Sequence, residues 1–153
     1  MSNSIAIASG KGGVGKTTIA VNLSLTLTQM GTKVSLIDAD FGLANAHILL
    51  GINPKKTIRD LLKNGLSIEE IIETGPSGLK FISGGNGLID ILNIEKNSKY
   101  QLIRSLDPIQ KTTDTLMVDI PAGASENSMT FASAVDKLVI VLVSEPTSFM
   151  DAY

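Results

Sequence analysis

A glycine-rich loop near the amino terminus places the tightest constraint on how this chain can fold. Residues 10 to 18 read Gly-Lys-Gly-Gly-Val-Gly-Lys-Thr-Thr, which satisfies the phosphate-binding pattern Gly-x4-Gly-Lys-[Ser/Thr]. A short apolar run, Ile5–Ala8, precedes the loop, and apolar residues at near-helical spacing follow it as far as Gly31. Strand, loop and helix in this order form the context that a phosphate cradle requires.

The loop predicts a site for the polyphosphate of a nucleotide. Its glycines let successive backbone N–H groups point inward, and the start of the following helix adds partial positive charge. We expect Lys16 to reach the β- and γ-phosphates, Thr17 to ligate Mg²⁺ and Thr18 to hydrogen-bond a more distal phosphate. The predicted nucleotide-binding residues are Gly10, Lys11, Gly12, Gly13, Val14, Gly15, Lys16, Thr17 and Thr18.

Lys11 is a second lysine, one more than the nucleotide site of a monomer needs. A lysine in a loop is ordinarily a solvated charge, but this one lies inside an anion-binding loop. Such a side chain can point away from its own nucleotide and meet the phosphates of a facing subunit. The extra lysine therefore predicts that ATP holds two subunits together.

The rest of the chain alternates between apolar runs and helical patterns, which predicts a doubly wound α/β domain with a mainly parallel sheet. The predicted strands are Ile5–Ala8, Val34–Ile37, Leu79–Ile82, Leu116–Ile120 and Leu138–Val143. The predicted helices are Ile19–Met30, Thr57–Lys63, Ser67–Glu73, Tyr100–Ile109 and Asn127–Ala134. With 153 residues and no linker-like segment, the chain is predicted to form one domain.

Carboxylates follow two of the predicted strands. Asp38 and Asp40 come directly after the second strand, and Asp119 lies near the end of the fourth. In an open parallel sheet, ligands bind at the carboxyl ends of the strands. We therefore expect these aspartates beside the phosphate loop, with Asp119 at the position that holds Mg²⁺ through water.

Composition excludes several other classes of function. The net charge of −2 shows no basic footprint for nucleic acid, and the absence of cysteine rules out disulfides, thiolate metal sites and thiol catalysis within these residues. The amino terminus has neither a basic segment nor a long apolar stretch. We expect a cytoplasmic protein.

Three segments together resemble the MinD/ParA family of deviant Walker A ATPases. They are the loop with Lys11 and Lys16, the stretch Asp38-Ala39-Asp40, and Asp119-Ile120-Pro121-Ala122-Gly123. Within the family, four further stretches look most like the flagellar number regulators known as FlhG, FleN or YlxH. These stretches are Asp38–Asn45, Leu49–Gly51, Pro54–Lys56 and Glu145–Tyr153.

The resemblance implies a P-loop NTPase fold of the SIMIBI class and a slow ATPase that works as a dimerisation switch with ATP and Mg²⁺. Lys11 would act across an ATP-dependent homodimer, Lys16 would bind phosphate and Asp40 would orient the attacking water. Thr17 would ligate Mg²⁺ directly, while Asp38 and Asp119 would support it through water. The implied further partners are the flagellar GTPase FlhF or a flagellar transcription regulator.

Family members continue through further elements that hold the adenine base and end in a membrane-targeting helix. We therefore expect residues 1–153 to be the amino-terminal portion of a P-loop ATPase domain, with a helix beginning at Tyr153. Peripheral membrane contact would need a helix beyond that point. Three alternatives stay open: a division-site MinD-type ATPase, an iron–sulfur carrier with ligands beyond Tyr153, and a nucleotide-binding module that does not hydrolyse ATP.

Overall fold

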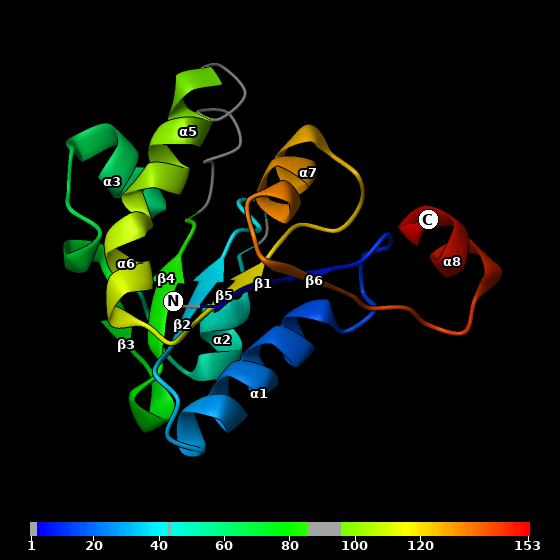
Figure 1. The fold of residues 1–153 in the computed structure, drawn as a ribbon, viewed down its shortest axis with the longest axis horizontal. Coiled ribbons are helices and arrows are strands. Elements are labelled where there is room, and N and C mark those ends of the chain that lie inside the picture. The colour runs from blue at the N-terminus through cyan, green and yellow to red at the C-terminus, as the bar shows by residue number, and fades with distance from the viewer. Residues whose placement is uncertain (1–2, 43, 86–95) are drawn as a thin grey trace.

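Six strands of the described chain form one sheet in the order β3-β4-β2-β5-β1-β6. The computed structural model describes residues 3–42, 44–85 and 96–153 (Figure 1). All neighbouring strands are parallel except β3 and β4, which are antiparallel. The strands are β1 (Asn3–Ala8), β2 (Val34–Asp38), β3 (Glu73–Thr74), β4 (Lys80–Ser83), β5 (Thr115–Asp119) and β6 (Lys137–Ile140).

Helices cover both faces of this sheet. Figure 1 shows α1 and α2 packed on one side of it, and α3, α5 and α6 grouped on the other. None of the helices in the described ranges combines the length and apolarity needed to cross a bilayer. The α-helices are α1 (Lys16–Gln29), α2 (Ala46–Leu50), α3 (Ile58–Asn64), α5 (Lys96–Ser105), α6 (Asp107–Thr112), α7 (Glu126–Ser133) and α8 (Pro146–Ala152), with 3₁₀ turns η1 (Glu69–Ile71) and η2 (Pro76–Gly78).

Two apolar cores follow from the alternation of side chains along the strands. Leu36 packs with the residues of α1 and α2, whereas its neighbour Ile37 packs with Ile58 of α3 and Phe131 of α7. Successive strand residues point to opposite faces, so a sheet covered on both sides needs apolar residues at consecutive positions. This explains the continuous apolar runs of the inner strands β2 and β5, whereas the residues of the edge strand β6 are exposed.

Strand register brings two of the predicted aspartates into line. Asp38 ends β2 and Asp119 ends β5, and the two residues are direct partners across these neighbouring parallel strands. β1 lies on the other side of β5, with Ile7 paired to Asp119. The phosphate loop that follows β1 therefore leaves the sheet at the same edge as both aspartates.

The predicted α/β fold with a mainly parallel sheet is confirmed, and several element boundaries differ. The predicted helix Ser67–Glu73 is only the short turn η1, since Glu73 pairs with β4 as part of β3. The predicted helix Tyr100–Ile109 is interrupted near Leu106, where α6 begins with Pro108 in its first turn.

Two further helices differ from expectation. The sequence pattern did not indicate α2, which has only five residues. The helix expected to begin at Tyr153 instead begins at Pro146, because proline is well suited to the first helical position.

Candidate nucleotide-binding site

The glycine-rich loop joins β1 to α1 and has the backbone geometry of an anion cradle. Gly13 and Gly15 have φ angles of 78° and 89°, in the left-handed region that glycine adopts without strain. Gly15 is the N-cap of α1, and its carbonyl accepts the first helical hydrogen bond, from Ile19. The positive end of a fourteen-residue helix therefore faces the loop.

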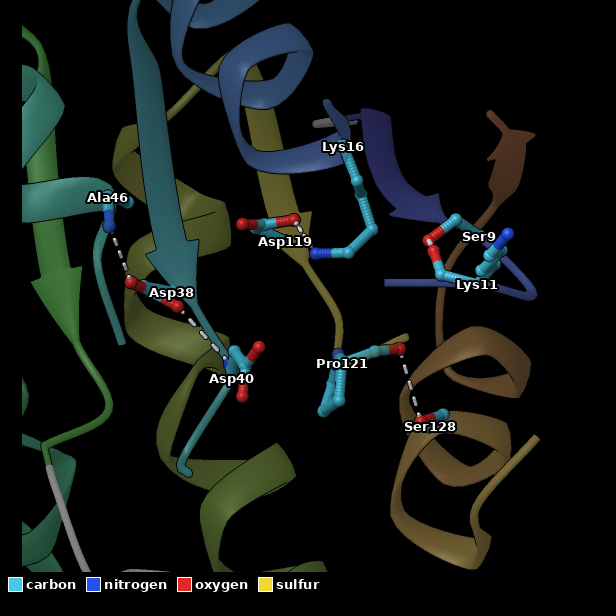
Figure 2. A network of polar contacts seen from close by, with 9 residues as sticks. All are labelled: Ser9, Lys11, Lys16, Asp38, Asp40, Ala46, Asp119, Pro121 and Ser128. Carbon is cyan, nitrogen blue, oxygen red and sulfur yellow. Dashed lines mark hydrogen bonds and ion pairs between the residues drawn. The ribbon is translucent and has the colours of Figure 1, made fainter. Parts of the chain in front are cut away.

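Lys16 lies at the start of α1 and points inward. Its Nζ donates to Asp119 Oδ1 over 2.5 Å, and both side chains are buried, at 7% and 0% exposed (Figure 2). The predicted phosphate lysine and the predicted magnesium aspartate are thus brought into direct contact. Among the residues that the structure describes, Asp119 is the carboxylate partner of this buried cation, and a phosphate oxygen can take its place.

The second oxygen of Asp119 provides a test of whether Mg²⁺ fits this site. Asp119 Oδ2 is buried and has no hydrogen-bond partner among the described residues. Thr17 lines the cleft beside the loop together with Lys16, the ion-pair partner of Asp119, and carboxylate and hydroxyl oxygens are the ligands that Mg²⁺ prefers. Thr17 and Asp119 therefore fit the ion.

Asp38 is fully buried, and both of its carboxylate oxygens accept backbone N–H groups. Oδ1 accepts from Asp40 over 3.2 Å and Oδ2 from Ala46 over 3.0 Å (Figure 2). Burial raises the pKa of Asp38 to about 6, the negative charges of Asp119 and Asp40 add to the rise, and the two backbone donors oppose it. The side chain thus faces the segment that carries Asp40.

A cleft of about 730 Å³ opens beside the loop, within the usual size range of ligand sites. Asp40 lines it, as do Ser9 and Ile48, which sequence reasoning did not name. Ile48 and Leu49 belong to α2, which ends at Gly51 in the left-handed conformation. The lining residues are Ser9, Gly12, Gly13, Gly15, Lys16, Thr17, Thr18, Asp40, Asn45, Ile48, Leu49, Pro121 and Ala122.

Lys11 lies on the outer side of the loop, away from Lys16. Its Nζ donates to Glu145 Oε2 over 2.7 Å, and the two side chains are 47% and 56% exposed. The hydrogen bond and the charge of Glu145 raise the pKa of Lys11, so the lysine stays protonated. The hydroxyl of Ser9 donates to the Lys11 carbonyl and fixes the backbone at this point (Figure 2).

Glu145 is a site residue that sequence reasoning did not identify. It precedes Pro146 at the N-terminus of α8, a helix that was expected from the sequence to begin only at Tyr153. The contact of Glu145 with Lys11 joins residues 134 positions apart, and no local signal reports such a separation.

A second cleft, of about 760 Å³, lies at the opposite edge of the sheet. Ser4, Asp107, Asp114 and Asp136 line it together with Lys111. It has neither a glycine loop nor a helix N-terminus of comparable length, so its residues do not form an anion cradle.

Comparison with known proteins decides the family. A family model described as an AAA domain matches residues 2–151. The antiactivator FleN of Pseudomonas aeruginosa is 37% identical over 149 residues, which cover 97% of this chain and 53% of FleN. The chain belongs to the MinD/ParA family of P-loop ATPases.

Two other members of the MinD/ParA family support the assignment. The flagellum site-determining protein YlxH of Helicobacter pylori is 36% identical, covering 97% of this chain and 51% of YlxH. The structure of the septum site-determining protein MinD of Pyrococcus horikoshii, complexed with Mg-ADP, matches with a TM-score of 0.85 and 28% identity. That match covers 99% of this chain and 62% of the MinD chain. This MinD/ParA chain spans about half the length of the curated relatives it matches.

Proposed function

We propose that this chain binds ATP with Mg²⁺ and hydrolyses it slowly, as a switch in which ATP joins two copies of the protein. The observation that carries the proposal is the arrangement of the two lysines on one loop. Lys16 is buried against Asp119 and serves its own cleft, whereas Lys11 is exposed on the outer side. A lysine in that position is placed for the phosphates of a second subunit.

The residues of the cleft support an in-line attack of water on the γ-phosphate. The new bond joins the water oxygen to the γ-phosphorus, the bond to the β–γ bridging oxygen breaks, and ADP and phosphate leave. Lys16 would move from Asp119 to the β- and γ-phosphate oxygens, and Asp40 would orient the attacking water and accept its proton. When bound, Mg²⁺ neutralises charge on the β- and γ-phosphates. Thr17 would hold the ion directly, and Asp119 through water.

Phosphate release from ATP with Mg²⁺ tests the proposal directly. We expect Lys16→Ala to abolish ATP binding and Asp40→Ala to abolish release while ATP still binds. Lys63→Ala, which removes an exposed lysine from the last turn of α3, is the control and should change neither. If both proteins bind ATP and Asp40→Ala releases phosphate at the wild-type rate, the chain is a nucleotide-binding module that does not use this site for hydrolysis.

Dimerisation is a separate measurement. Light scattering should show a doubled mass with ATP and Mg²⁺ but not with ADP, and Lys11→Ala should remain monomeric. If Lys11→Ala forms the dimer as readily as wild type, the role of Lys11 across the interface is wrong.

Flagellar number control is the biological role we propose, because the FleN and YlxH similarities reach 37% and 36% identity. The partner would be the flagellar GTPase FlhF or a flagellar transcription regulator, in the cytoplasm. A division-site role is the second candidate, favoured by the TM-score of 0.85 to MinD. Deleting the gene distinguishes the two: a changed number of flagella per cell supports the first, and misplaced septa support the second.

A further inference from the structure

Asp40, the residue proposed to orient water, lies in a segment that runs from the end of β2 to the start of α2. We propose that Asp38 is a positioning residue that holds Asp40 in place by fixing this segment at both ends. The inference rests on the proposed function, because it gives Asp38 a task in the same reaction. It also differs from the expectation that Asp38 supports Mg²⁺ through water.

One carboxylate binds two backbone donors that are six residues apart. Asp38 Oδ1 accepts from Asp40 N at the start of the segment, and Oδ2 accepts from Ala46 N at its end. An ionised carboxylate can accept on both oxygens at once, whereas an asparagine amide has one accepting oxygen. Because Asp38 is fully buried, water does not compete for these donors.

Other contacts leave the backbone around Asp40 little room to move. Ala39 N donates to the Asp119 carbonyl over 2.9 Å, which ties the segment to β5. Phe41 is 1% exposed, and 5.7 Å separates the centroid of its ring from that of the Phe131 ring. Both neighbours of Asp40 are therefore buried, and the Asp38 carboxylate restrains the amide of Asp40 itself.

The direction of the Asp38 side chain separates it from the phosphate-binding groups. Its oxygens face the segment and the start of α2, while Lys16 pairs with Asp119 (Figure 2). If Asp38 positions Asp40, substituting Asp38 should displace Asp40 and lower kcat. A metal-supporting role predicts a greater demand for Mg²⁺.

Asp38→Asn in the full-length protein distinguishes the two roles, with phosphate release measured against ATP and against Mg²⁺. We expect kcat to fall by about tenfold to a hundredfold, because small displacements of a reacting group have effects of this size. The KM for ATP and the Mg²⁺ concentration for half-maximal rate should stay within about twofold of wild type, since the phosphate loop is unchanged.

Asp38 must act through Asp40, and a double-mutant comparison measures this. Adding Asp38→Asn to Asp40→Asn should leave the residual rate unchanged. Asp136→Asn is the matched control, because Asp136 also accepts a backbone N–H, from Ser4 over 2.9 Å, and a hydroxyl, but at the opposite edge of the sheet. This variant should keep the wild-type kcat.

Several results would overturn the inference. Recovery of the Asp38→Asn rate at high Mg²⁺ would show a metal-supporting role, and a further loss in the double variant would show that Asp38 does not act through Asp40. An Asp40→Asn variant with wild-type turnover would refute the proposed function itself. If Asp38→Asn does not bind ATP, amide exchange in the wild type decides. The amides of Asp40 and Ala46 must be protected, and rapid exchange of either would refute the positioning role of Asp38.

Discussion

Lys11 and Glu145 form an ion pair, with 2.7 Å between Nζ and Oε2, that ties the phosphate loop to the start of α8. The lysine proposed to serve a second subunit is thus held by a carboxylate of its own chain. Both side chains are largely exposed, and exposed pairs of this kind are weak. The multiple negative charges of a facing ATP can therefore displace Glu145.

Removing the charge of Glu145 should favour dimerisation. Glu145→Gln leaves Lys11 without its ionic partner, and we expect ATP-dependent dimer at a concentration of protein about twofold to fivefold lower than wild type. Light scattering against protein concentration at fixed ATP measures this. Glu69→Gln removes the same charge from the remote turn η1 and should behave as wild type. A weaker dimer in Glu145→Gln would mean that Glu145 contributes to the interface.

The buried carboxyl of Asp38 should make stability depend on pH. Burial raises the pKa of Asp38 from 3.8 to about 6, so the folded state binds the Asp38 proton more tightly than the unfolded state does. The stability that this proton contributes is therefore full below about pH 4 and is lost as pH rises through about 6. Asp38→Asn lacks this titration. Relative to wild type, its free energy of unfolding should therefore gain up to about 3 kcal/mol between pH 4 and pH 7. Urea denaturation with EDTA and no nucleotide measures the free energy of unfolding of both proteins. A difference between them that stays constant with pH would contradict the prediction.

Gly10 should not tolerate a side chain. A Cβ built on Gly10 overlaps the backbone of Asp151 in α8, whereas one on Gly12 meets nothing within 4 Å. We expect Gly10→Ala to lower the free energy of unfolding by about 1 to 3 kcal/mol, because the backbone must shift to make room. Gly12→Ala is the matched control and should be nearly neutral. Equal stability of the two variants in thermal unfolding would contradict the close approach of α8.

Phe41 should matter for stability although it lies beside the site. Its ring is buried against Phe131, so Phe41→Ala is expected to cost about 3 to 5 kcal/mol. Phe149→Ala removes the same ring from a site that is 56% exposed and should change stability little. Urea denaturation of the two variants gives the comparison, and a similar loss in both would show that Phe41 is not a core residue.

The sequence predicted the sheet well because a strand buried on both faces leaves a distinctive apolar run. Val34–Ile37 and Leu116–Ile120 correspond to β2 and β5 within a residue or two. Short elements were missed for the same physical reason. α2 and β3 have five and two residues, and their stability comes from packing on their neighbours rather than from any local pattern.

The residues of the site were predicted individually, but their pairing was not. Lys16 and Asp119 were both expected at the cleft, yet nothing local indicated that they contact each other without nucleotide. Glu145 was not predicted at all, because its contact with Lys11 depends on how α8 packs beside the loop. The hydrogen bond from Ala46 N to the Asp38 carboxylate likewise depends on a backbone path that the apolar pattern does not encode.

The register that pairs Asp38 with Asp119 also limits how the protein can change in evolution. A single inserted or deleted residue within β2 would turn every later side chain of that strand to the other face and carry Asp38 out of line. Changes of length should therefore accumulate in connections such as Pro54–Lys56, while the lengths of β2 and β5 stay constant among descendants that keep this site.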